Sequence, residues 1–326
     1  MTKKTAGAGS SADTSSLTHA GTYLPGRLRE ETAKRKRRLP ESVDVLITRA
    51  LDIEANDAKE SGALGFMARC MTMASLPHSR IAGNEFERRN GKFSLSIIAP
   101  ARIGIPYGTV PRLLLAWLTT EAVRTKSRDL VLGDNLSDFM RQLDMVPTGG
   151  RWGSIGRLKD QTQRLFTASI TALYEDADRT AMLGYRIADK ALLWWNAKDP
   201  AQGSLWESTV TLTPQFFEEV TTRPVPIDMR ALRGLKKSPL ALDMYCWLTF
   251  RMSYLEKPTE VSWAALQGQF GAGYPRTAQG MRDFRKHFLP ALQKVLLVYP
   301  EAKAAPTLDG IRLAPGRPHV PKLAAR

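Results

Sequence analysis

The sequence predicts an α+β protein that contains two tandem copies of one module. Two observations carry this prediction. A helix with the triplet Trp-Leu-Thr is followed twice by a short helix, a turn that contains glycine and a longer helix, which is the order of a helix-turn-helix. Each longer helix then leads into residues with the apolar and aromatic pattern of strands. A hairpin after a helix-turn-helix makes a winged helix, so we expect two tandem winged-helix domains with flexible basic termini.

A chain of 326 residues is long enough for two domains and additional tails. Residues 1–38 are rich in Ser, Thr, Ala and Gly, lack apolar periodicity and end in KRKRR, so we expect a disordered basic arm. The basic cluster is either a tether to phosphates or a solubilising tail. The remaining boundaries divide the chain into an N-terminal winged-helix domain with a possible dimerisation role (39–220), a basic linker (221–237), a C-terminal winged-helix DNA-binding domain (238–300) and a basic wing and tail (301–326).

The charge balance indicates the class of partner. Forty-seven Lys and Arg face 32 Asp and Glu, which leaves a net charge of +15 and favours a polyanion over small neutral metabolites. Two Cys and four scattered His fit no zinc spacing, so we expect no metal site, no disulfide scaffold and a reducing compartment. No apolar run approaches the ~20 residues of a membrane span, so we expect a cytoplasmic protein without membrane contact.

The elements before the first module are a helix and a hairpin. Apolar residues recur at three- and four-residue steps after Pro40, which predicts a helix to about Ala58. The segment EFERRNGKFSLSII (85–98) carries Asn-Gly between two runs, and its second run alternates between apolar and polar residues. This pattern predicts a β-hairpin early in the chain.

The first module begins with PRLLLAWLTTEAVR (111–124), an apolar helical stripe that places Trp117 in a core. A short helix (136–145), the turn PTGG (147–150) and a long helix from about Ser154 to Tyr174 follow. Two strand-like runs in 180–196, on either side of Ala188-Asp189-Lys190, then predict the hairpin of the wing.

The second module repeats this order. The helix PLALDMYCWLTFRMSY (239–254) carries Trp247, and 261–270, the turn GAGYP and a helix from about Arg276 to Leu289 follow. Pro290 lacks a backbone N–H, so we expect the helix to kink or restart there, and VLLVYP (295–300) and 310–313 are expected strands. The joint between the copies is expected to be a semi-rigid connector. Its cations either track the minor groove or only keep the linker soluble: Arg223, Arg230, Arg233, Lys236 and Lys237.

The third helix of the first module has an apolar side and a polar stripe. Arg binds guanine bidentately and Gln binds adenine, and the first residues of a recognition helix lie deepest in the major groove. Ser154 at the expected N-cap would also donate to a phosphate. The alternative is a solvated amphipathic face. The DNA-binding candidates on this helix are Ser154, Arg157, Lys159, Gln161, Gln163 and Arg164.

The corresponding helix of the second module is more strongly cationic. Asp283 is the only carboxylate between Arg276 and Leu289, so the helix suits a groove lined by phosphates. Arg312 and Arg317 in the wing and tail are candidates for phosphate contacts. The DNA-binding candidates on the helix are Arg276, Thr277, Gln279, Arg282, Arg285 and Lys286.

The sequence lacks the common signatures of catalysis. The chain has no GxxxxGK[ST], no GxGxxG after a strand, no GxSxG, no tight acidic cluster for two Mg²⁺ ions and no paired His for metal-dependent DNA nicking. We therefore expect binding without bond-breaking, no catalytic residues and no cofactor.

A resemblance to a known family rests on specific runs. The segment IPYGTVPRLLLAWLTTEAVRTKSRDLVLGDNLSDFMRQLDMVPTGGRWGSIGRLKDQTQRLF (105–166) resembles the plasmid-encoded RepA replication initiators of IncW-type plasmids. The pairing of PRLLLAWLTTEAVR with PTGGRWGSI is the specific part, and LDMYCWLTFRM, QFG and VLLVYP extend the similarity over about 40–300. The first 38 and last 25 residues take no part in it.

The resemblance implies a bacterial protein that binds repeated sites, iterons, in duplex DNA at a plasmid origin and helps to open the duplex. It implies monomers at iterons, dimers that repress the protein's own promoter, and host partners such as the chromosomal initiator and the replicative helicase. It also implies that the helix of Arg157 and Gln161 switches between DNA and a dimer surface, whereas Arg282 and Arg285 read bases in both states. Two alternatives remain open, namely a winged-helix transcriptional repressor without a replication role and a DNA-nicking or primer-making enzyme.

Overall fold

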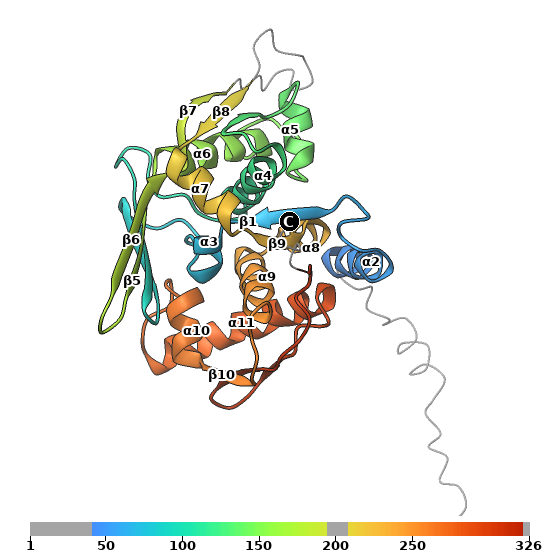
Figure 1. Cartoon of the computed structure of the whole chain (residues 1–326), viewed down its shortest axis with the longest axis vertical. Helices are drawn as coiled ribbons and strands as arrows, with labels where there is room; N and C mark the ends of the chain where they lie inside the picture. Colours follow the sequence, from blue (N-terminus) through green and yellow to red (C-terminus); the bar gives the residue numbers. More distant parts are fainter. Residues whose placement is uncertain (1–40, 194–207, 322–326) are drawn as a thin grey trace, which may run out of the picture. The chain divides into compact units, whose positions relative to one another are not determined.

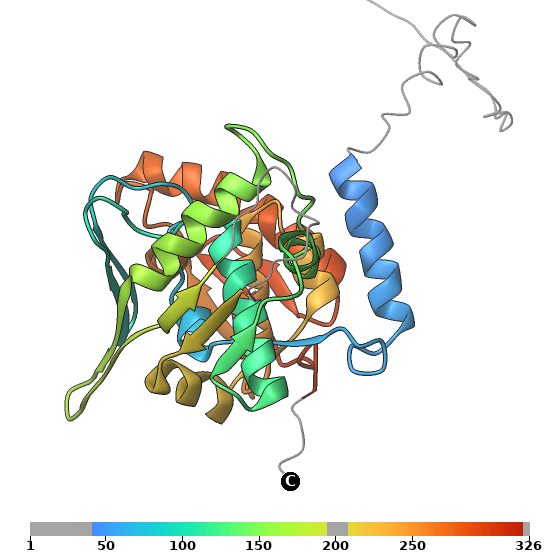
Figure 2. The same ribbon diagram turned by 90° about the horizontal axis from the view of Figure 1, so that it is seen from above.

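The computed structural model describes residues 41–193 and 208–321. The predicted basic arm, residues 1–38, lies outside this part of the chain. The described residues begin with α2 (Glu41–Ala55), which forms where the apolar periodicity predicts a helix and ends three residues before the expected end. Figures 1 and 2 show α2 at one side of the molecule and the largest sheet at the opposite side.

The first module has the predicted helices, with one strand after the first of them. Trp117 is 5% exposed, its ring meets Phe139 edge to face at 5.1 Å, and its Nε1–H donates to Gln142 Oε1 at 2.7 Å. The expected core position of Trp117 is thereby confirmed, and the polar end of its ring is satisfied. The elements are α4 (Thr109–Thr125), β4 (Asp129–Val131), α5 (Leu136–Gln142), α6 (Ser154–Thr167), β7 (Ala188–Leu192) and β8 (Thr209–Leu212).

The second module has the same order of elements. Trp247 is 6% exposed and packs edge to face on Phe270 at 5.5 Å between ring centroids, so it too is a core residue, as expected. The elements are α9 (Pro239–Met252), β10 (Thr259–Ser262), α10 (Trp263–Phe270), α11 (Ala278–Val298), β11 (Ala304–Pro306) and β12 (Gly310–Leu313).

The small sheets of the two modules have matching topology. In each, the strand that follows the first helix pairs antiparallel with the last strand, and that last strand pairs with the one before it. The strand orders are β4-β8-β7 and β10-β12-β11. The molecule is therefore a mixed structure of helices and antiparallel sheets in which one order of elements occurs twice.

A four-stranded antiparallel sheet, in the order β2-β3-β5-β6, lies outside this repeat (Figure 1). The expected hairpin at Asn90-Gly91 is confirmed, since Asn90 pairs with Phe93 across β2 and β3. The strands are β2 (Glu85–Asn90), β3 (Phe93–Ile98), β5 (Ser169–Glu175) and β6 (Thr180–Arg186).

Two expectations for the first module are wrong at this sheet. The third helix ends at Thr167 instead of Tyr174, because Ile170 and Ala172 alternate inward on β5 and their strand pairs with β3. The runs around Ala188-Asp189-Lys190 do not form a hairpin with each other. They lie in different sheets, since β6 pairs with β5 and β7 pairs with β8.

The last helix corrects two further expectations. α11 runs through Pro290 to Val298, so the helix does not end at Leu289 and VLLVYP is not a strand. Proline removes one backbone hydrogen bond, and here its ring is exposed to solvent. The stripe of Phe284, Phe288, Leu292 and Val295, all at most 2% exposed, keeps the helix packed on both sides of the proline.

The segment expected to be a connector is packed into the fold. α7 (Pro214–Thr222) precedes it, β9 (Val225–Asp228) pairs antiparallel with β1 (Leu64–Met67), and α8 (Met229–Gly234) follows. α3 (Arg69–Met73) packs against α9.

Arg230, one of the cations that could track a minor groove, is 5% exposed. It binds Asp228 at 2.7 Å between Nη2 and Oδ2. The groove-tracking interpretation is wrong for this side chain, because folding buries it against its own N-cap carboxylate.

A buried ion pair joins the first helices of the two modules. Arg112 on α4 donates from Nε to Asp243 Oδ1 at 2.6 Å and from Nη2 to Oδ2 at 2.7 Å, and Asp243 lies on α9. The same guanidinium donates to the carbonyls of Leu76 and Gly108, and His78 Nε2 lies 2.8 Å from Asp243 Oδ2. Within residues 41–193 and 208–321, no helix is long and apolar enough to cross a bilayer.

Candidate nucleic-acid interface

The start of α11 is held by a compact turn. Thr277 is the N-cap residue, and its Oγ1 accepts a hydrogen bond from the backbone N–H of Gly280 at 3.1 Å. A Cβ at Gly280 would lie 2.0 Å from the carbonyl oxygen of Pro275, so only glycine lets the turn cross the helix this closely. The turn leaves Arg276 exposed at the N-terminal end of α11.

The N-terminal half of α11 separates an apolar side from a cationic side. Phe284 and Phe288 are both 0% exposed, whereas Gln279, Arg282 and Lys286 are exposed. Arg282 donates from Nη2 to Gln279 Oε1 at 2.6 Å, and Gln279 Nε2 donates to Asp283 Oδ1 at 3.0 Å. This chain of hydrogen bonds holds the amide and the guanidinium side by side on the solvent side of the helix.

Arg285 lies beside this exposed stripe and is half-buried. Its Cζ is 4.8 Å from the centroid of the Trp263 ring, and its Nε has no hydrogen-bond partner among the described residues. The stacking holds the guanidinium plane against α10, so Arg285 is more constrained than its neighbours on α11.

The corresponding helix of the first module, α6, presents fewer free donors than the sequence predicts. Arg157, Lys159 and Gln163 are exposed, as expected. The expectation of a continuous reading stripe is wrong for the other three candidates, because the loop before α4 and the turn before α6 engage Ser154, Gln161 and Arg164.

The contacts of these three residues give the physical reason. Gln161 is 4% exposed, its Oε1 accepts from the Tyr107 N–H at 2.8 Å, and its Nε2 donates to Asp160 at 2.9 Å. Ser154 is buried, its Oγ accepts a hydrogen bond from the Thr148 N–H, and its own N–H donates to Thr148 Oγ1. The N-cap residue of α6 is Gly153 instead of the expected Ser154. The Arg164 side chain is 11% exposed and pairs with Asp160 at 2.9 Å.

Gln161→Ala is expected to lower the free energy of unfolding by about 1–3 kcal/mol, because the Tyr107 N–H loses its acceptor. Gln163→Ala, which removes an exposed amide from the same helix, is the control and should change stability by less than about 0.5 kcal/mol. Urea unfolding of the two variants compares these effects. If Gln161→Ala leaves stability unchanged and weakens DNA binding, Gln161 contacts DNA instead of stabilising the fold.

The last strand of the second module carries one exposed candidate, and the tail carries another. Arg312 lies on β12 opposite Glu260 of β10 and is exposed. Arg317 is exposed as well, while its carbonyl accepts from the Tyr299 hydroxyl at 2.6 Å, which fixes the backbone of the tail against the core. The tip between β11 and β12 exposes Leu308, at 90%.

Sequence reasoning missed two groups of side chains near these helices. Trp152, in the turn before α6, is 82% exposed, and Arg151 Cζ lies 5.2 Å from its ring. A tryptophan in a glycine-rich turn with no apolar stripe was the available signal. The second group is Arg88 and Arg89 on β2, which line a cleft beside the start of α11. β2 packs against α10 in the folded chain, and no local sequence pattern predicts that contact.

The comparison with protein families concerns the middle of the chain. Residues 105–264 match the family model described as "Plasmid encoded RepA protein". The matched segment covers just under half of the chain, from the loop before α4 to the second residue of α10, and α11 lies beyond it. The resemblance stated from the sequence is confirmed over these residues.

Two solved structures are similar to this chain. One is titled as a crystal structure of selenomethionine derivatives of domains 2 and 3 of RctB, with 13% identity, 70% of this chain and 82% of that chain covered, and a TM-score of 0.47. The other is titled as RctB domains 2-3, with 12% identity, coverages of 74% and 93%, and a TM-score of 0.45. A search of curated proteins gave no match.

Proposed function

We propose that this protein initiates plasmid replication by binding repeated sites in duplex DNA, with α11 as the principal base-reading helix. The observation that carries the proposal is the exposed cationic stripe on the N-terminal half of α11, which lies over a fully buried aromatic side. Helices enter the major groove with their N-terminal residues against the base edges, where Arg and Gln bind guanine and adenine. The RepA family match of residues 105–264 supports the replication role.

Both modules are interpreted as winged helices in this proposal. The repeated order of a helix, a strand, two helices and a hairpin supports the interpretation, as does the matching strand order of the two small sheets. Phosphate contacts from Arg312, Arg317 and the exposed cations of α6 would provide affinity, and base contacts from Arg282 and Gln279 would provide specificity.

The first module contributes to DNA binding in a different way. α6 keeps Arg157, Lys159 and Gln163 exposed, which suits contacts to the DNA backbone more than base reading. Several copies bound on adjacent repeats would bend the DNA and load strain onto a neighbouring A+T-rich segment, whose melting costs least. Host initiator and helicase proteins would act on the opened strands, and this chain needs no bond-breaking chemistry for that role.

The test is a selection of tight binders from a pool of duplexes with a random core, performed with the full chain. Enrichment of one motif, and binding of that motif at least about 10³-fold tighter than a scrambled duplex at physiological salt, is expected for a specific reader. The motif should occur as direct repeats in the DNA next to this gene. A pool that remains random after selection would contradict the proposal.

Two further measurements separate replication from the alternatives. A plasmid that carries the flanking repeats should be maintained only when this protein is supplied, and maintenance without it would leave a repressor role. Supercoiled DNA incubated with the protein and Mg²⁺ should stay supercoiled, whereas relaxed or nicked product would indicate an enzyme.

A further inference from the structure

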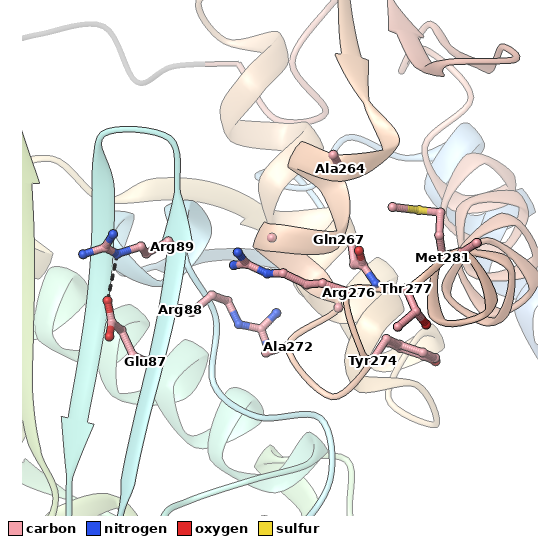
Figure 3. A pocket seen from close by; sticks show the side chains of 13 residues that line it. Glu87, Arg88, Arg89, Ala264, Gln267, Ala272, Tyr274, Arg276, Thr277 and Met281 are labelled. Atoms are coloured by element: carbon pink, nitrogen blue, oxygen red, sulfur yellow. Dashed lines mark hydrogen bonds and ion pairs between the residues drawn. The ribbon is translucent and has the colours of Figure 1, made fainter.

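A cleft of about 840 Å³ lies between β2 and the turn that joins α10 to α11. Figure 3 shows Arg88 of β2 and Arg276 before the helix reaching into it from opposite walls, whereas the Arg89 side chain turns to the other face of β2, toward Glu87. Neither the family match nor the proposed base-reading stripe accounts for the strand side of this cleft. Its lining therefore raises the question of which ligand the arginines would hold.

Arg88 is the unusual member of the lining. The residue is only 3% exposed, its Nη1 donates to the carbonyl of Gln269, and its Nε has no hydrogen-bond partner among the described residues. Its Cζ lies 5.3 Å from the centroid of the Phe86 ring, which covers one side of the guanidinium. Burial lowers the pKa of Arg88 to about 10, so the group stays charged at neutral pH while it lacks the solvation of an exposed arginine.

The opposite wall supplies further donors to an anion. The first turn of α11 has backbone N–H groups that no helical carbonyl can satisfy, and Thr277 caps only that of Gly280. Arg276 and Tyr274 line the same wall. Burial and the nearby Asp283 raise the pKa of Tyr274, which keeps its hydroxyl protonated as a donor.

The charge of the lining favours an anion. Glu87 is the one carboxylate among the lining residues, and its Oε1 already accepts from Arg89 Nε at 2.9 Å on the other face of β2. Arg88 and Arg276 therefore leave the cleft itself with a positive charge. The walls also approach closely, because a Cβ at Gly268 of α10 would lie 3.3 Å from the carbonyl oxygen of Arg89. A desolvated guanidinium, a helix N-terminus and a net positive lining are the components from which phosphate sites are built.

We propose that this cleft binds a phosphoryl group between Arg88 of β2 and Arg276 at the N-terminus of α11. Two sources carry this chemistry, namely a phosphate of the DNA backbone next to the reading helix and a free nucleotide. With DNA as the source the inference rests on the proposed function, because the same duplex then contacts α11 and β2. With a nucleotide as the source it stands independently of DNA binding.

The first experiment measures binding of tripolyphosphate, ATP and adenosine to the full chain by calorimetry at constant ionic strength. Saturable binding of one tripolyphosphate is expected, with at least tenfold loss in Arg276→Ala and in Arg88→Gln and less than twofold change in Arg124→Ala, an exposed arginine of α4 outside the cleft. ATP much tighter than tripolyphosphate would identify a nucleotide as the source. Absence of saturable binding by either polyanion, or an equal loss in Arg124→Ala, would overturn the proposal.

The second experiment identifies the DNA backbone as the source. Arg276→Ala should weaken binding to specific and scrambled duplexes by the same factor and reduce the salt slope by about one contact, because a phosphate contact carries no sequence information. Arg276 is exposed, so this variant keeps the proposal testable if Arg88→Gln does not fold. A protein that shows no sequence preference but binds tripolyphosphate through Arg276 would refute the proposed function and leave the cleft site intact.

Discussion

Asp243→Ala is expected to lower the free energy of unfolding by about 3–5 kcal/mol, because it removes one partner of a buried ion pair. The carboxylate is 7% exposed and binds Arg112 through two hydrogen bonds of 2.6 and 2.7 Å. Its removal leaves the Arg112 guanidinium, 4% exposed, as a buried charge without its counterion. Urea or thermal unfolding measures the effect, and a concerted loss of packing between α4 and α9 should accompany it.

The matched control is Asp189→Ala. Asp189 pairs with Arg128 at 2.9 Å, but both side chains are 37% exposed, so water replaces the lost partner and the expected change is about 0–1 kcal/mol. Equal changes in the free energy of unfolding of the two variants would show that burial does not increase the contribution of the Arg112–Asp243 pair to stability.

The same cluster predicts a loss of stability in acid. Burial acts to raise the pKa of Asp243, but the attraction of Arg112 and the hydrogen bonds from His78 and Arg112 outweigh it, so the pKa lies below its usual value. Stabilisation from such a carboxylate is complete above the pKa of an unfolded Asp, about 3.9, and is lost as the pH falls further.

His78 acts in the same direction. Burial lowers its pKa against the opposing effect of Asp243, so the unfolded chain binds a proton more readily than the folded chain below about pH 6.5. Unfolding measured from pH 7 to pH 3 should show a smaller loss of stability in the double variant His78→Ala/Asp243→Ala, which removes both titrating groups, than in the unaltered protein. An equal loss in the double variant would assign the acid sensitivity to other groups.

Arg282→Ala is expected to weaken binding to the selected DNA motif by about 1–3 kcal/mol, which is about 5- to 150-fold, with a much smaller effect on scrambled DNA. The side chain is exposed on α11, and Gln279 holds its guanidinium at 2.6 Å, so the loss removes an oriented donor at the groove. Titrations of fluorescent duplexes at several salt concentrations measure both affinities.

Arg157→Ala on α6 is the control for position in the fold. It removes an exposed arginine from the equivalent helix of the first module, and we expect similar, smaller losses on both DNAs together with a lower salt slope. Equal losses on specific and scrambled DNA in Arg282→Ala would mean that α11 contacts phosphates and does not read bases.

The amino-acid sequence by itself determined the elements whose pattern depends on one buried face. The helices around Trp117 and Trp247, the Asn90-Gly91 hairpin and the repeated order of helices follow from local periodicity and turn chemistry, and the structure has them. The cationic side of α11 also follows from sequence, since alternation of phenylalanines with basic residues at helical spacing separates an inner from an outer face.

Tertiary structure decided where each pattern stops and which polar groups stay free. VLLV continues α11 past Pro290 because its apolar residues extend the buried helical stripe, and β6 and β7 separate because each finds a different partner strand. Periodicity on α6 does not distinguish Gln161 from Gln163, yet Gln161 binds the Tyr107 N–H while Gln163 faces solvent. Local pattern records the chemical character of a face, but a distant loop or strand covers it, and that contact exists only in the folded chain.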